Sequence, residues 1–292
     1  MRTLLAFILI FSFTACSDSD VQKNGGGPSD SEVQTTEGPP PDSESPKKAD
    51  IQTQEIDYTA GDTTLKGYLA WDKAVTGKRP GILVVHEWWG HNEHARERAR
   101  MLAKLGYTAL AVDMYGDGQT ADHPKKAGEL MSAAMKDWEG SMARFRAAKK
   151  VLQDHETVDP EKIASIGFCF GGTVSLRMAR AGEDLDAVVA FHAGLPEDSA
   201  APGSVKAAVL VINGSEDVWL DPKVVAKFQK EMKEATVDFT YITLPGVKHA
   251  YTNKQADEMS RKFDIPNLQY NQEADQKAWT TMEFLFKRVF AK

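Results

Sequence analysis

The sequence Gly-Phe-Cys-Phe-Gly-Gly at residues 167–172 decides the fold, because it has the pattern of a sharp turn between a strand and a helix. An apolar run at residues 163–166 precedes it, and a helix-forming run at residues 173–180 follows it. G-x-C-x-G is a cysteine version of the nucleophile elbow G-x-S-x-G. Flanking glycines let strand and helix pass closely, and a helix N-terminus favours a thiolate. The pattern therefore predicts a nucleophilic thiol at Cys169; a small, inert, buried cysteine is the alternative.

Apolar strands alternate with helical segments along the chain on both sides of this turn. Strands are expected at residues 54–71 (one or two strands), 82–85, 108–112, 163–166, 187–191, 208–212 and 239–242. Helices are expected at residues 92–105, 222–234 and 271–290, with one or two more before residue 154. This alternation predicts an α/β fold with a mostly parallel central sheet and helices on both faces. Sites in such sheets form at the carboxyl ends of the strands.

Two further residues at predicted strand ends complete a possible catalytic set with Cys169. A thiol nucleophile needs a base, and the base needs an acid that orients it. Asp217 lies in the loop after one buried strand, and His249 lies between the last strand and the closing helix. Asp217 is preferred over Glu216 because it lies further beyond the strand, and Asp221 is the fallback. The order nucleophile, acid, base is that of α/β-hydrolases and predicts a Cys-His-Asp triad.

The first fifty residues have the composition of a targeting segment and a tether. Residues 4–13 are almost wholly apolar but too short to span a bilayer, as in a signal peptide. Cys16 follows in a context that resembles the lipobox of bacterial lipoproteins; an ordinary signal peptide is the alternative. We therefore expect a lipoprotein-type signal peptide at residues 1–16, a disordered tether at 17–50 and a globular domain at 51–292. Lipidation of Cys16 would anchor the protein in the cell envelope, on a bacterial membrane, facing the periplasm or the surface.

Charge and motif content narrow the classes of partner. The net charge of −7 offers no basic face for nucleic acid. His86 and His91 flank Glu87, but their spacing of five residues does not fit the zinc motif H-E-x-x-H. We therefore expect neither a metal nor a cofactor, and a small molecule as the partner. The sequence does not determine an oligomeric state.

The domain resembles the dienelactone hydrolase family of α/β-hydrolases over roughly residues 51–290. The resemblance rests on residues 167–172, on Gly-Ser-Glu-Asp at 214–217, on Gly-Val-Lys-His at 246–249 and on His-Glu-Trp-Trp-Gly at 86–90. It implies an α/β-hydrolase fold and hydrolysis of a small ester or lactone, as of dienelactone to maleylacetate, through a thioester. It also implies that Glu87 contacts and helps to activate the resting thiol. The backbone N–H groups of Trp88 and Phe170 would form the oxyanion hole.

The resemblance also identifies where this chain departs from the family. Family enzymes hold a substrate carboxylate with arginines, one of them four residues after the catalytic histidine, where this chain has Asn253. We expect Asn253, Tyr115, His192 and Tyr251 in the substrate pocket, with Trp88 at its mouth. Two alternatives remain open. One is a thioesterase or general carboxylesterase on the same triad, and the other is a non-catalytic thiol-redox or binding lipoprotein.

Overall fold

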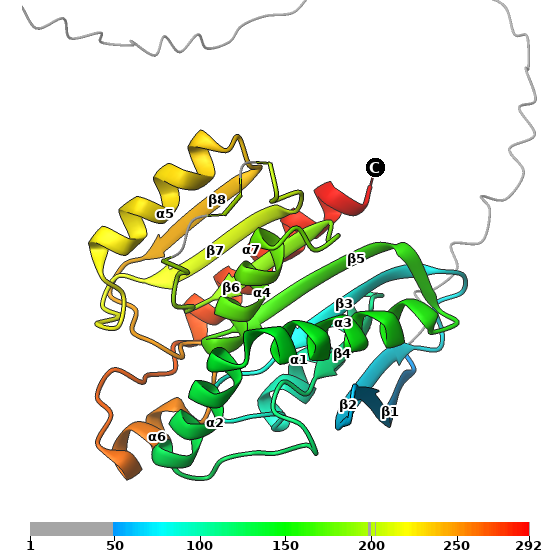
Figure 1. Cartoon of the computed structure of the whole chain (residues 1–292), viewed down its shortest axis with the longest axis horizontal. Helices are drawn as coiled ribbons and strands as arrows, with labels where there is room; N and C mark the ends of the chain where they lie inside the picture. The colour runs from blue at the N-terminus through cyan, green and yellow to red at the C-terminus, as the bar shows by residue number, and fades with distance from the viewer. Residues whose placement is uncertain (1–48, 198–199, 202, 292) are drawn as a thin grey trace, which may run out of the picture. The chain divides into compact units, whose positions relative to one another are not determined.

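The computed structural model describes residues 49–197, 200–201 and 203–291 (Figure 1). The predicted signal peptide, Cys16 and the tether as far as residue 48 lie outside these residues. None of the helices in the described ranges is long and apolar enough to cross a membrane.

The core of the described chain is an eight-stranded sheet in the order β1-β2-β4-β3-β5-β6-β7-β8. Its strands are β1 (Ile51–Ala60), β2 (Thr63–Asp72), β3 (Arg79–Val85), β4 (Thr108–Val112), β5 (Val158–Phe168), β6 (Ala187–Phe191), β7 (Ala208–Gly214) and β8 (Phe239–Leu244). β1 and β2 form an antiparallel hairpin, and β2 pairs with β4 in antiparallel orientation. All other neighbours are parallel. Figure 1 shows the hairpin at one edge of the sheet and β8 at the other. The predicted mostly parallel sheet is confirmed.

Helices cover both faces of the sheet, as predicted. They are α1 (Glu93–Lys104), α2 (Pro124–Lys136), α3 (Trp138–Asp154), α4 (Phe170–Arg180), α5 (Pro222–Glu234), α6 (Ala256–Phe263) and α7 (Gln272–Phe290). Alternate residues of each buried strand face opposite sides. Leu83 and Val85 share one apolar cluster with α3, α4 and α5, whereas Ile82 and Val84 share the other with α1 and α7.

The structure differs from the sequence prediction mainly after β8. Helix α6 was not predicted, because it is only eight residues long, four of these residues are charged and only Ala256 is buried. Strand β5 begins five residues before the apolar run, and its first part includes Asp159, Glu161 and Lys162. The carboxyl ends of β3, β5, β7 and β8 carry the four predicted catalytic residues Glu87, Cys169, Asp217 and His249.

Candidate active site

Cys169 occupies a strained turn between β5 and α4. Its backbone has φ 51° and ψ −116°, a conformation that a residue with a side chain rarely adopts. A Cβ at Gly167 would lie 2.1 Å from the carbonyl oxygen of Gly171, and one at Gly171 would lie 2.3 Å from that of Val85. Both glycines are therefore required for α4 to start so close to the sheet. The turn leaves the thiol half-buried at the first turn of α4.

His249 and Asp217 are brought together from loops that follow neighbouring strands. Gly214 allows the two loops to lie close, because a Cβ at this position would come 2.0 Å from the Val247 carbonyl oxygen. His249 Nδ1 donates to Asp217 Oδ2 over 2.6 Å. Both side chains are buried. Asp221 instead caps α5 by accepting the Lys223 N–H, so the structure places Asp217 and not the fallback on the histidine.

The Asp217 carboxylate is held on its other side by two donors. Its Oδ1 accepts from Asn267 Nδ2 over 3.0 Å and from the Trp219 N–H over 3.1 Å. Burial alone would raise the pKa of Asp217, but the hydrogen bond and charge of His249, with these two donors, lower it below its usual range. The acid is therefore ionised and fixed in orientation.

The electrostatics of His249 couple it to both Asp217 and Cys169. Burial lowers the pKa of this imidazole, but the negative charge of Cys169 and the hydrogen bonds that the imidazole donates to Asp217 and Cys169 outweigh burial and raise it to about 10. Because Asp217 occupies Nδ1, the interaction of His249 with Cys169 is assigned to the buried Nε2. The arrangement stabilises an imidazolium beside a thiolate.

Glu87 lies directly after β3 and is almost completely buried, with 2% of its surface exposed. Asn253 Nδ2 donates to its Oε2 over 2.5 Å, and His94 Nδ1 lies 3.9 Å from the same oxygen. In the described part of the chain, no hydrogen bond joins Glu87 to Cys169. The interaction that the structure shows for Glu87 Oε2 is the one with Asn253, and the contact with the thiol that the family resemblance implies stays a prediction. Burial raises the pKa of Glu87 to about 7 despite the opposing effects of Asn253, His249 and Arg98.

Replacing Glu87 with glutamine is expected to stabilise the protein at alkaline pH. A pKa raised from 4.5 to about 7 means that the native state loses about 3 kcal/mol of stability as pH rises through this interval. Glutamine carries no charge, so the loss disappears. Chemical denaturation should show that Glu87→Gln exceeds wild type in stability at about pH 8 and matches it at about pH 4.

Glu97→Gln is the matched control for that experiment. Glu97 forms an ion pair with Lys254 over 2.6 Å, and this pairing lowers its pKa although burial opposes the change. Its replacement should slightly destabilise the protein at about pH 8, by about 1 kcal/mol at most. Equal stability of wild type and Glu87→Gln at both pH values would contradict the burial of an ionised Glu87.

The predicted oxyanion donors are two backbone N–H groups, one after β3 and one at the start of α4. The Phe170 N–H is the first of α4 and has no acceptor within the helix. The Trp88 N–H, which follows Glu87 at the end of β3, donates to no acceptor among the described residues. Both groups are therefore available to a developing negative charge.

Aromatic rings surround this end of the sheet. Trp219, half of whose surface is exposed, has its ring 4.6 Å from that of His249. Trp88 lies 6.5 Å from Trp219 and 4.9 Å from Trp89 between ring centroids. Sequence reasoning missed Trp219. The apolar pair Val218 and Trp219 directly after Asp217, in an otherwise polar loop, is the signal that could have found it.

The predicted pocket residues divide into two groups. Tyr115 donates its hydroxyl to the Trp88 carbonyl over 3.0 Å, and its pKa is raised by burial and by the charge of nearby Cys169. Asn253 is buried against Glu87. Tyr251 and His192 are fully buried, which corrects their assignment to the pocket surface.

Tyr251 and His192 instead pack behind the triad. The Tyr251 hydroxyl donates to the Ile212 carbonyl over 3.0 Å, which satisfies it inside the core. His192 Nε2 lies 2.8 Å from Thr252 Oγ1, and its ring packs 5.0 Å from that of His249. These residues support the base from the sheet side. His192 directly follows a buried strand, and this position suggested a pocket residue, but it does not determine which way the side chain points.

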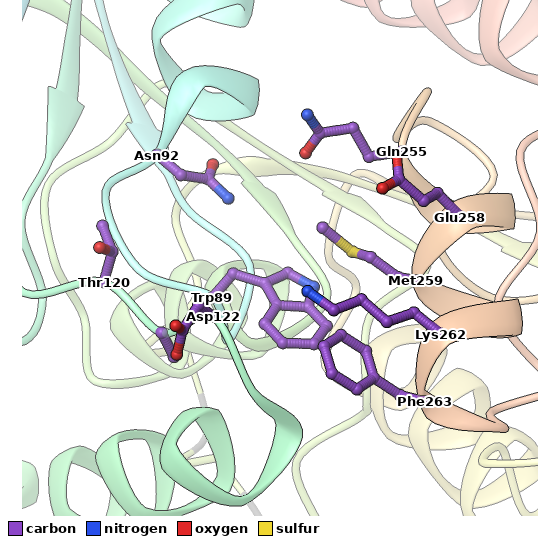
Figure 2. Close-up of a pocket in the computed structure, with 10 residues that line it drawn as sticks. Trp89, Asn92, Thr120, Asp122, Gln255, Glu258, Met259, Lys262 and Phe263 are labelled. Carbon is purple, nitrogen blue, oxygen red and sulfur yellow. The ribbon is translucent and has the colours of Figure 1, made fainter.

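A separate cavity of about 320 Å³ lies beside the site, under α6 (Figure 2). It is lined by Trp89, Asn92, Thr120, Ala121, Asp122, Gln255, Glu258, Met259, Lys262 and Phe263. None of the triad residues lines it. Trp89, which lines the cavity, stacks on Phe263 with ring centroids 6.0 Å apart and contacts Trp88 edge to face at 4.9 Å. Across the described residues, no three His, Cys, Asp or Glu side chains gather where they could hold a metal ion.

Comparison with known proteins places this chain among hydrolases. The family model for the dienelactone hydrolase family matches residues 65–290. Protein usf of Aquifex pyrophilus is 29% identical over 240 residues, covering 80% of this chain and 97% of that protein. A putative carboxymethylenebutenolidase of Aquifex aeolicus is 29% identical over 212 residues, covering 70% and 90%.

A solved structure is similar over the same region. The dienelactone hydrolase-like promiscuous phosphotriesterase P91 from metagenomic libraries is 35% identical, with a TM-score of 0.78. The match covers 82% of this chain and 98% of that one. The predicted α/β-hydrolase fold is confirmed.

Proposed function

The chain belongs to the dienelactone hydrolase family, and we propose that it hydrolyses a small ester or lactone through a thioester on Cys169. Membership makes it a carboxylic ester hydrolase. The observation that carries the mechanism is the His249 imidazole, which is bound to Asp217 through Nδ1 and interacts with Cys169. The name carboxymethylenebutenolidase, given to a relative, describes the opening of such a lactone.

The proposed reaction has two stages. The Cys169 thiolate adds to the substrate carbonyl carbon, and the π electrons of the carbonyl move onto its oxygen. The resulting oxyanion accepts hydrogen bonds from the Trp88 and Phe170 N–H groups. The tetrahedral intermediate collapses to a thioester, and the alcohol oxygen leaves with the proton from His249 Nε2. His249 then removes a proton from water, which attacks the thioester. The second tetrahedral intermediate collapses, the C–S bond breaks and the carboxylic acid is released. Cys169 is again a thiolate, and His249 is again an imidazolium.

The charges around the thiol favour a neutral substrate. Asn253 is committed to Glu87. Arg98, the nearby cation, donates to Asp275 over 2.9 Å and to the Thr252 carbonyl. A substrate carboxylate would therefore find neither the Asn253 amide nor the Arg98 guanidinium free to bind it. We propose a neutral ester or lactone whose apolar part contacts Trp88 and Trp219.

A substrate panel tests the proposed function. The panel contains dienelactone, phenyl acetate, methyl acetate and an acyl thioester. Faster hydrolysis of phenyl acetate, a neutral ester, than of dienelactone, which carries a carboxylate, supports the neutral substrate class. Preference for the thioester would favour the thioesterase alternative. If no member is hydrolysed, the hydrolase proposal fails and a thiol-redox or binding role replaces it.

Trp219→Ala is expected to weaken binding of aryl esters specifically. Loss of an aromatic contact costs about 1 kcal/mol, so KM for phenyl acetate should rise about fivefold to tenfold with little change in kcat. KM for methyl acetate should not change. Phe284→Ala, which removes an exposed aromatic ring on α7, is the control and should leave both values unaltered. An unchanged KM for phenyl acetate in Trp219→Ala would show that the substrate does not contact this ring.

We also propose that Cys16 carries a lipid anchor in the cell envelope. This proposal rests on the sequence of residues 1–16 alone. Detergent-phase partition of the full-length protein tests it, and recovery in the aqueous phase would contradict it.

A further inference from the structure

His86 is a buried histidine next to Glu87 with no part in the proposed proton transfers. It is completely buried at the end of β3. Its Nδ1 lies 2.5 Å from the carbonyl oxygen of Glu87, and its Nε2 accepts the Met114 N–H over 3.3 Å. The ring packs between Tyr115 at 4.7 Å and Phe170 at 5.8 Å. His86 therefore contacts Phe170, which carries one proposed oxyanion donor, and bonds to the Glu87–Trp88 peptide, which carries the other.

The tautomer of His86 follows from its two partners. Burial lowers the pKa of this imidazole, so it is neutral and carries a single proton. The Met114 N–H needs a lone pair on Nε2. The proton therefore sits on Nδ1 and is donated to the Glu87 carbonyl.

The Glu87 carbonyl belongs to the same peptide unit as the Trp88 N–H. A trans peptide is planar, and its C=O and N–H point in opposite directions. The Gly90 N–H also donates to this carbonyl, over 3.2 Å. Two donors on the oxygen thus fix the plane of the peptide and aim its free N–H. Hydrogen bonds to the carbonyl also polarise the unit and make the N–H a stronger donor.

The loop after β4 holds His86 and the next peptide in place. The Asp113 carboxylate accepts the N–H groups of Tyr115, Gly116 and Gly118 over 2.8–2.9 Å. This network fixes the position of Met114. The Tyr115 hydroxyl bonds the Trp88 carbonyl, so the peptides on both sides of Trp88 are restrained.

We propose that His86 is a positioning residue that fixes the Glu87–Trp88 peptide with its N–H directed at the oxyanion. This inference rests on the proposed function and specifies how that site prepares one of its two donors. The cost of rotating the peptide during the reaction is avoided, because the group is held before the substrate arrives.

Two variants of His86 separate this role from packing. Asparagine places an amide N–H close to the position of Nδ1, whereas leucine has a similar volume to histidine and no donor. Loss of an oxyanion donor costs about 10²- to 10³-fold in kcat, and loss of its alignment should cost less. We expect His86→Leu to lower kcat for phenyl acetate by about 10- to 100-fold with little change in KM. His86→Asn should recover most of this loss.

Two readouts distinguish the oxyanion from the thiol. A trifluoromethyl ketone adds reversibly to a thiolate and forms an oxyanion, so its Ki should rise in His86→Leu by the factor that kcat/KM falls. Alkylation of Cys169 by iodoacetamide forms no oxyanion and should proceed at the wild-type rate.

The outcomes separate this inference from the proposed function. A kcat of His86→Leu equal to that of wild type would overturn this inference but not the proposed function. Equal losses of hydrolysis and of Cys169 alkylation would do the same, because they indicate a structural role. Failure of His86→Asn to exceed His86→Leu would also overturn it. Wild-type protein that neither hydrolyses esters nor binds the ketone would overturn the proposed function and this inference with it.

Discussion

Replacing Cys169 with alanine should lower kcat for phenyl acetate by at least about 10³-fold and leave the fold intact. Alanine cannot form the thioester, so only catalysis by the oxyanion donors and by binding remains. The cysteine side chain is small and half-buried, so its removal leaves no large cavity and costs little stability. Steady-state hydrolysis and thermal unfolding measure the two effects on the same sample.

Cys169→Ser is the companion variant. A serine hydroxyl is a much weaker acid than a thiol, and the site stabilises an imidazolium beside a thiolate. The variant should therefore retain measurable but strongly reduced activity. Activity of Cys169→Ala equal to that of wild type would show that the chemistry lies elsewhere in the molecule.

Asp217→Asn should lower kcat by about 10³- to 10⁴-fold through the tautomer of His249. Asp217 Oδ1 accepts from Asn267 and from the Trp219 N–H, so an asparagine would keep its oxygen at that position. Its NH2 group would then face His249 Nδ1. The histidine would have to accept there and carry its proton on Nε2, where it could not take a proton from the thiol. Kinetics at neutral pH measure the loss.

Asp221→Asn is the matched control for that variant. Asp221 lies four residues further along and caps α5 without contacting His249. Asparagine caps a helix about as well as aspartate, so activity and stability should both stay close to wild type. Similar losses in the two variants would mean that Asp217 acts on the fold of the loop and not on the base.

The architecture was predictable from sequence because each buried strand is a continuous apolar run. β6 and β7 are almost wholly apolar runs that follow each other between α4 and α5, and the elbow between β5 and α4 has the glycines that its geometry requires. Helix α6 was not predictable in the same way. It spans only eight residues, half of them charged, so it lacks the length and the apolar content that mark a buried helix in a sequence.

The candidate site was predictable where a strand end determines position and unpredictable where distant side chains meet. Asp217 and His249 follow strands directly, so chain order brought them to the same edge. The bond between Asn253 and Glu87 joins residues 166 positions apart. Burial of Tyr251 depends on the Ile212 carbonyl, which no local pattern reveals.

Trapping of an acyl-enzyme tests the central claim most directly. Wild-type protein is mixed with phenyl acetate, quenched in acid within one turnover, digested and analysed by mass spectrometry. Our account predicts an acetyl group on the peptide that contains Cys169, formed in a burst with release of phenol and lost at the rate of turnover. Release of phenol and acetate at the same rate, with no acetyl group on Cys169 at any time, would contradict it.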